Sequence, residues 1–140
     1  MKLKRILVTV NGKPPDKEAI LLACSLARKP KAEIYVIHVI EVKRSLPLDA
    51  EIQADINKAE EILKEAENTA LEKDALIKTD LVQSRTAGPA IVDEARDRNI
   101  DLIIMGLNYK QQFGIFSLGN TIPHVMEEAP CRVILLRESA

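Results

Sequence analysis

The sequence predicts an α/β domain in which a parallel β-sheet carries helices on both faces. Five short runs rich in β-branched residues alternate along the chain with segments of helical spacing, which is the pattern of parallel strands joined by right-handed crossovers. The runs are nearly continuously apolar, as expected for strands covered on both sides. The length of 140 residues fits one domain, which we expect to span residues 1–140.

The first half of the chain predicts a β-α-β unit and then a long helix. Residues 5–10 (RILVTV) form a strand that ends at an Asn-Gly turn, and the Pro-Pro pair that follows starts a helix. Residues 33–40 (EIYVIHVI) form the second strand. From residue 49 to 73 apolar residues recur every three or four positions between charged faces. This spacing favours a helix packed on the sheet over a coiled coil.

The second half continues the alternation. The expected elements are a third strand over residues 76–82, a helix over 88–98, a fourth strand over 101–105, a short helix near 122–126 and a last strand over 131–136. Lys78 and Asp80 in the third strand favour a position at the edge of the sheet. The connection from Gly106 to Gly119 is longer than the roughly two to six residues of an ordinary βα loop. We expect it to be unstructured and functional.

Composition excludes several partners and locations. Twenty Lys and Arg residues against 21 Asp and Glu leave a net charge of −1, so no basic field is available to hold a nucleic acid. The apolar run near the N-terminus is shorter than a secretory or membrane-spanning segment, so we expect a cytoplasmic protein that does not enter the membrane. Cys24 and Cys131 lie far apart in the sequence and are predicted to be buried thiols.

The carboxyl ends of the strands are the places to look for a ligand, because open parallel sheets bind ligands there. The connection after the fourth strand holds Tyr109, Phe113 and Phe116, three of the four aromatic residues of the chain. Its last part resembles a phosphate-binding loop but has Asn120 in place of the lysine, which argues against a P-loop enzyme. The helix start at residues 119–121 suits an anion, or else is capped by one of its own polar side chains.

Several segments together resemble the universal stress protein family over almost the whole chain. The segments, in order, are residues 6–12 (ILVTVNG), His38-Val39, residues 88–91 (GPAI), residues 101–106 (DLIIMG), Leu118-Gly119 and residues 129–133 (APCRV). The resemblance implies a five-stranded parallel sheet of order 3-2-1-4-5, of the Rossmann-like type found in adenine nucleotide alpha hydrolases. It also places the loops after strands one and four opposite each other, at the point where the strand order reverses.

ATP-binding members of that family carry Gly-x2-Gly-x9-Gly-[Ser/Thr] after strand four and an aspartate after strand one. This chain keeps the spacing with Gly106 and Gly119 but has Tyr109, Asn120 and Asn11 at the other three positions. A tyrosine does not supply the conformational freedom of glycine, so it would fill part of the pocket. An amide oxygen at residue 11 is expected to accept from the adenine amine. The implied site for ATP or another adenine nucleotide consists of Asn11, Val39, Gly106, Asn108, Tyr109, Gly119, Asn120 and Thr121.

The resemblance further implies a homodimer that forms through the last strand, Cys131 to Leu136, whose apolar edge would otherwise be exposed. Three functions remain open at this point. The first is a regulatory protein with a modified nucleotide pocket and no turnover. The second is a protein–protein adaptor that binds no nucleotide and uses the aromatic connection from Gly106 to Gly119. The third is slow hydrolysis of a nucleotide.

Catalysis finds little support, because no catalytic or metal-binding motif is present. His38 is expected to be a hydrogen-bonded core residue and His124 a surface residue. Asp101 is expected in the turn before strand four. Arg85 follows strand three on the ligand side, where it could meet an anion.

Overall fold

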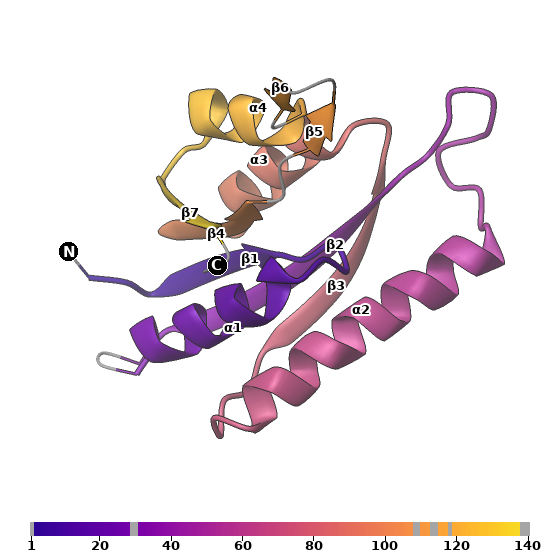
Figure 1. The fold of residues 1–140 in the computed structure, drawn as a ribbon. Coiled ribbons are helices and arrows are strands. Elements are labelled where there is room, and N and C mark those ends of the chain that lie inside the picture. The colour runs from indigo at the N-terminus through magenta and orange to yellow at the C-terminus, as the bar shows by residue number, and fades with distance from the viewer. Residues whose placement is uncertain (1, 29–30, 108–109, 113–114, 118, 138–140) are drawn as a thin grey trace.

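We describe the chain from a computed structural model. Its centre is a five-stranded parallel sheet, seen in Figure 1. The structure describes residues 2–28, 31–107, 110–112, 115–117 and 119–137. The strands of the sheet are β1 (Arg5–Thr9), β2 (Glu33–Glu41), β3 (Lys78–Ser84), β4 (Leu102–Leu107) and β7 (Arg132–Arg137). Their spatial order is β3-β2-β1-β4-β7, so the predicted order 3-2-1-4-5 is confirmed.

Helices cover both faces of the sheet. The helices of the described residues are α1 (Pro15–Leu26), α2 (Gln53–Leu71), α3 (Ala87–Asp97) and α4 (Thr121–Glu128). In Figure 1, α1 and α2 lie on one face, and α3 and α4 lie on the other. The predicted three-layer α/β architecture is therefore confirmed.

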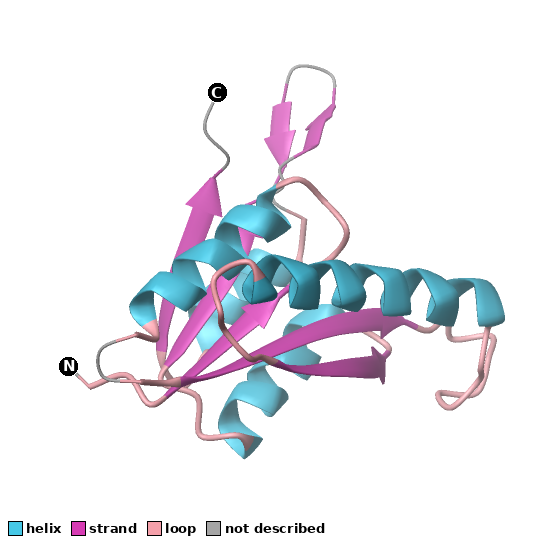
Figure 2. Cartoon of the chain, turned by 90° about the horizontal axis from the view of Figure 1, so that it is seen from below, coloured by secondary structure: helices cyan, strands magenta, loops and turns pink. Residues whose placement is uncertain are grey.

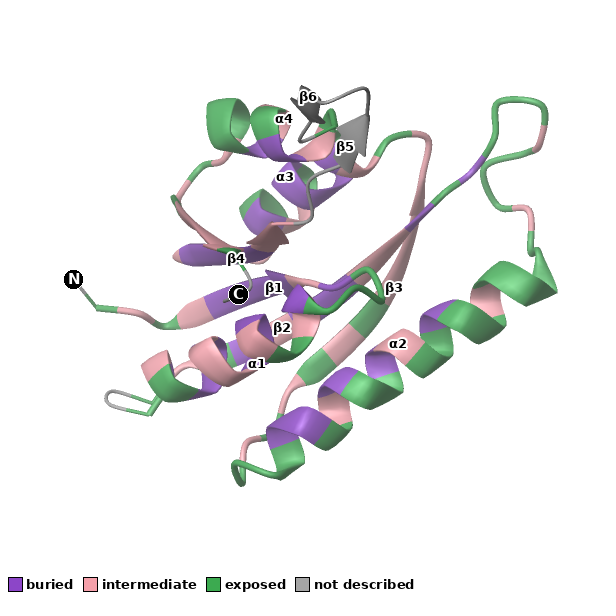
Figure 3. Cartoon of the chain, viewed as in Figure 1, coloured by how far each residue is buried: buried purple, intermediate pink, exposed green. Residues whose placement is uncertain are grey.

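Alternating side chains of the strands build an apolar core on each face of the sheet. In Figure 3, which colours the chain by burial, β1 is largely in the colour of buried residues. On β1, Ile6 and Val8 pack toward α1 and α2, whereas Leu7 packs toward α3 and α4. All three are fully buried. Burial of both faces explains why the strands read as continuous apolar runs in the sequence, since neither face is left for polar residues.

Asp101 fixes the amino end of the sheet. Its Oδ2 accepts hydrogen bonds from the backbone N–H groups of Lys4 at 2.8 Å and Arg5 at 3.0 Å. The carboxylate thereby ties the turn before β4 to the start of β1. The prediction that Asp101 is a turn residue is confirmed.

The connection after β4 contains a β-hairpin, so the expectation that it is unstructured is wrong. Strand β5 (Lys110–Gln112) pairs antiparallel with β6 (Ile115–Ser117). Figure 2 shows this hairpin projecting beyond the sheet. Strands of three residues are too short to produce a periodic signal in the sequence, and the hairpin was therefore missed.

The third strand begins later than predicted. Leu76 is 87% exposed, and pairing with β2 starts at Lys78, which lies opposite Tyr35. The charged groups of Lys78 and Arg98 each lie 5.3 Å from the centre of the Tyr35 ring. β3 lies at one edge of the sheet, as its charged residues indicated.

The two cysteines differ in burial. Cys24 is buried, as expected, whereas Cys131 is only half-buried because it precedes the edge strand β7. Burial raises the pKa of both thiols above the ordinary value. Within the described part of the chain, none of the helices has the length and apolar character needed to cross a membrane. The cytoplasmic location stays a prediction.

Candidate functional site

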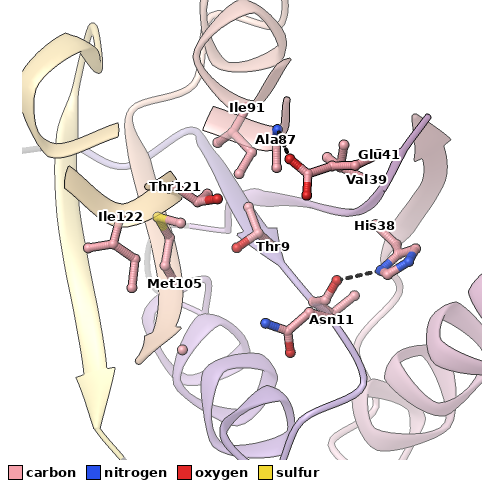
Figure 4. A pocket seen from close by; sticks show the side chains of 12 residues that line it. Thr9, Asn11, His38, Val39, Glu41, Ala87, Ile91, Met105, Thr121 and Ile122 are labelled. Atoms are coloured by element: carbon pink, nitrogen blue, oxygen red, sulfur yellow. Dashed lines mark hydrogen bonds between the residues drawn. The ribbon is translucent and has the colours of Figure 1, made fainter. Parts of the chain in front are cut away.

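A cavity of about 260 Å³ lies at the carboxyl ends of β1, β2 and β4. It is closed on one side by the first turns of α3 and α4. Its lining residues, most of them labelled in Figure 4, are Thr9, Val10, Asn11, His38, Val39, Glu41, Ala87, Ile91, Met105, Gly106, Thr121 and Ile122. β1 lies between β2 and β4, so the cavity occupies the place where the strand order reverses, the usual ligand site of such sheets.

The turn after β1 is held by a carboxylate. Asp16 Oδ2 accepts from the backbone N–H of Gly12 at 2.7 Å and of Asn11 at 3.1 Å. Burial raises the pKa of the Asp16 carboxyl above its usual value, although these two amides and the nearby His38 oppose the effect. The same carboxylate lies in the first turn of α1, where the helix dipole favours a negative charge.

His38 holds the same turn from the side of β2. Its Nδ1 lies 2.8 Å from the carbonyl oxygen of Val10. A carbonyl oxygen only accepts, so Nδ1 carries the proton and donates. The prediction that His38 is hydrogen-bonded is confirmed. The prediction that it belongs to the core is met only in part, because the residue is half-buried and borders the cavity.

Asn11 is exposed at the rim of the cavity, and its amide oxygen is already engaged. Oδ1 accepts from the backbone N–H of Lys13 at 3.1 Å, an arrangement in which an asparagine side chain closes its own turn. The oxygen keeps a second lone pair, so its predicted hydrogen bond from an adenine amine stays a prediction.

Glu41 is the acidic side chain of the cavity lining. Its Oε2 accepts from the backbone N–H of Ala87 at 3.0 Å, at the first residue of α3. Figure 4 shows this contact at the end of the cavity away from Asn11. The second carboxylate oxygen has further lone pairs to offer to a donor. The sequence analysis missed Glu41 because it ended the strand at residue 40, although Val39 and Glu41, two residues apart, share one face of β2.

Gly106 and Gly119 are each required by the backbone, for different reasons. A Cβ added to Gly106 would lie 2.7 Å from the Cβ of Pro15, so the end of β4 packs directly on the start of α1. Gly119 has φ +70°, in the region that favours glycine, and a Cβ added there would meet no atom within 4 Å. Gly106 thus has a packing role whether or not a ligand is bound.

Four of the eight predicted site residues line the cavity, namely Asn11, Val39, Gly106 and Thr121. Gly119 and Asn120 are exposed and precede α4, where the Asn120 side chain makes no capping hydrogen bond. Asn108 and Tyr109 lie outside the described residues, as does the direction of the Tyr109 ring.

Two further residues have partners that the sequence did not indicate. Arg85 Nη1 donates to the backbone carbonyls of Lys43 at 2.6 Å and Leu46 at 2.8 Å, so it ties down the loop after β2. A contact of Arg85 with an anion stays a possibility that the structure does not test. His124 is half-buried. It packs so closely on Gly88 that a Cβ there would lie 3.0 Å from the His124 Cβ.

Comparison with known proteins identifies the family. The model of the universal stress protein family matches residues 2–137. The chain belongs to the universal stress protein family. A universal stress protein of Thermus aquaticus is 32% identical over 96% of this chain and 98% of its own length.

Solved structures of the family share the fold. A universal stress protein from Archaeoglobus fulgidus has a TM-score of 0.75 and 25% identity, covering 94% of this chain and 92% of its own. A structure of the universal stress protein from the same organism in complex with dAMP has a TM-score of 0.77 and 22% identity, covering 96% of this chain and 98% of its own. The strand-order reversal is thus part of a fold in which one relative holds a nucleotide.

Proposed function

We propose that this universal stress protein is a regulatory protein of the stress response that binds a purine nucleotide in the cavity between Asn11 and Glu41 and does not turn it over. The observation that carries the proposal is the cavity itself. It lies at the strand-order reversal, and the first turn of α4 borders it through Thr121. The dAMP complex of a relative with the same fold supports a nucleotide as the ligand class.

The residues suit a nucleoside better than a highly charged phosphate chain. The volume of about 260 Å³ lies just below the roughly 300–1,000 Å³ of typical ligand sites, which is enough for a base and its sugar. Among the described lining residues, none is Lys or Arg, and Glu41 is acidic. The phosphate groups would therefore lie outside, toward the start of α4, where the helix dipole favours an anion. ATP, the cofactor implied by the sequence, is the least suited of the adenine nucleotides because it carries the most charge.

Thermal unfolding with added nucleotide tests the proposal. A ligand at a hundredfold excess over its Kd adds about 2.7 kcal/mol to the free energy of unfolding. Val39→Phe places a larger side chain in the cavity and should abolish the effect, whereas Leu76→Phe, at a position 87% exposed, should leave it intact. If no AMP, ATP or IMP at millimolar concentration stabilises the wild-type protein, the proposal fails.

We also propose a homodimer formed through β7. This strand is at an edge of the sheet and pairs with β4 alone in the described chain. Its four central residues, Val133 to Leu136, are apolar and only half-buried. An apolar edge strand without a pairing partner promotes aggregation. Leu136→Lys should convert the dimer to a monomer in sedimentation, and Leu76→Lys should not. A monomeric wild-type protein would refute the dimer.

A protein–protein adaptor is the second candidate function, because the β5–β6 hairpin projects beyond the sheet, where a partner protein could reach it. The two functions differ in where the rings of Phe113 and Phe116 lie. If the rings are anchors for a partner, replacing both by serine should leave the free energy of unfolding of the isolated protein unchanged. If they pack against their own chain, the loss should reach about 3 kcal/mol or more.

A further inference from the structure

The turn after β1 contains the one asparagine of the chain that a glycine follows, Asn11-Gly12. Asparagine is a chemically labile residue, because the backbone nitrogen of the next residue can attack its side-chain amide carbon. A following glycine favours this attack, since it has no side chain to hinder the approach. Both residues are exposed, so water can reach the bonds that would change.

The side chain of Asn11 is folded back toward the bond that would attack it. Its Oδ1 accepts from the backbone N–H of Lys13 at 3.1 Å. The ring that this hydrogen bond closes contains both Cγ of Asn11 and the nitrogen of Gly12. The N–H group also stabilises negative charge on the amide oxygen, as a donor in an oxyanion hole does. The carbon that would be attacked is therefore held near the nitrogen and is activated.

The Asp16 carboxylate opposes the attack by its charge and by its hydrogen bonds. Its Oδ2 lies 2.7 Å from the nitrogen of Gly12 and accepts from that N–H. Deamidation requires this nitrogen to lose its proton, and a neighbouring carboxylate disfavours a second negative charge. The same Oδ2 accepts from the backbone N–H of Asn11 at 3.1 Å, so the backbone is fixed on both sides of the reacting side chain.

Two other contacts hold the turn without engaging the nitrogen of Gly12. His38 Nδ1 donates to the carbonyl of Val10 at 2.8 Å. The Ile62 side chain lies 3.0 Å from the place of a Cβ on Gly12, whose φ of +81° suits glycine. Among the described residues, only Asp16 accepts from the Gly12 N–H. The reactivity of the turn therefore depends on this one carboxylate.

We propose that Asn11-Gly12 is a deamidation site that the Asp16 carboxylate keeps unreactive in the folded protein. When the Asp16 contact opens, the Gly12 nitrogen gives up its proton and bonds to Cγ of Asn11. The bond from Cγ to Nδ2 breaks, and Nδ2 leaves as ammonia with that proton. Water then opens the cyclic imide, either at Cγ to leave an aspartate or at the backbone carbonyl to leave an isoaspartate. One water is consumed and one ammonia is released.

Either product places a new carboxylate at the rim of the cavity. Glu41 is already acidic, and the described lining residues include no Lys or Arg. A second negative charge should raise the Kd for AMP by up to about fivefold, the usual limit for interactions between solvent-exposed charges. This effect rests on the proposed nucleotide site, whereas deamidation itself needs no ligand.

Peptide mass spectrometry after incubation of the folded protein at neutral pH tests the site. Deamidation should be slow in the wild type and at least about tenfold faster in Asp16→Ala, because a hydrogen bond to a charged acceptor is worth about that factor. Asp16→Asn keeps an acceptor but no charge, so its rate should be intermediate. Asn68, which Thr69 follows in α2, serves as the internal reference. Heavy-oxygen water should label the product at residue 11.

Asp101→Ala is the matched control, because this variant also removes a carboxylate that accepts from two backbone amides of β1 or its flank, at the end away from the cavity. It should deamidate at the wild-type rate. Equal acceleration in Asp101→Ala would assign the effect to lost stability, and the proposal would fall. It would also fall if Asp16→Ala left the rate unchanged, or if the folded wild type reacted as fast as the protein unfolded in urea. If Asp16→Ala does not fold, Asp16→Asn decides.

Titration with AMP examines the effect on the cavity separately. Protein deamidated at residue 11 and the Asn11→Asp variant should both bind AMP more weakly than the wild type. An unchanged Kd would overturn the effect on the ligand. Absence of AMP binding in all forms would refute the nucleotide site, whereas the deamidation rates would still decide the modification.

Discussion

Gly106→Ala should destabilise the protein without any involvement of a ligand. The new Cβ would lie 2.7 Å from the Cβ of Pro15, whereas two carbon atoms prefer a separation of roughly 3.5–4.0 Å. Pro15 is buried at the first position of α1, so it yields only if the helix moves. Overpacking of this kind costs about 1–3 kcal/mol.

Urea unfolding measures this loss. With a slope of about 2 kcal/mol per molar, a loss of about 2 kcal/mol lowers the midpoint by about 1 M. A double-mutant cycle assigns the cause, because Pro15→Gly removes the opposing atom. In the Pro15→Gly background Gly106→Ala should cost at least 1 kcal/mol less than in the wild type, about the coupling expected of residues in contact. Full additivity, or a loss below about 0.5 kcal/mol for Gly106→Ala alone, would refute the packing argument.

Three further substitutions probe carboxylates that accept hydrogen bonds from backbone N–H groups. Asp101→Ala leaves two backbone amides at the start of β1 without their acceptor and should lower the free energy of unfolding by about 1–3 kcal/mol in urea titration; a change within experimental error would contradict this. Glu41→Gln weakens the charge–dipole interaction at the start of α3 by about 0.3–1 kcal/mol, and this loss should shrink in high salt. Burial raises the pKa of Asp16 above its ordinary value of 3.8, so the native state binds this proton more tightly than the unfolded state. Its contribution to stability is greatest below pH 3.8 and declines as the pH rises through the raised pKa. The difference in unfolding free energy between the wild type and Asp16→Asn should therefore decrease from about pH 3.5 to pH 6, and an increase would show that the hydrogen bonds outweigh burial.

The sheet could be predicted from the sequence because both of its faces are buried. The run from Ile6 to Val8 is fully buried in the structure. When helical segments flank such an apolar run, it indicates a strand of a parallel sheet that is covered on both faces. The β5–β6 hairpin could not be predicted in the same way, because its strands span only three residues each. Local pairing decided its structure, and neither length nor periodicity reports such pairing.

The candidate site was predictable in its location but not in its chemistry. Asn11 could be placed after the first strand from the sequence, yet the hydrogen bond by which its side chain closes the turn to Lys13 appears only in the structure. Glu41 could have been found by extending the second strand by one residue. His124 shows a further limit, since the contact between α4 and Gly88 that half-buries it arises from the packing of two helices far apart in the chain.

The double attachment of the turn after β1, to Asp16 and to His38, has a consequence for kinetics. A turn that is already held in place in the free protein loses little conformational entropy when a ligand binds. The ligand can therefore bind without waiting for the turn to rearrange. Amide hydrogen exchange at Asn11 and Gly12, whose N–H groups both donate to Asp16, should accordingly be slow in the free protein and change little when nucleotide is added.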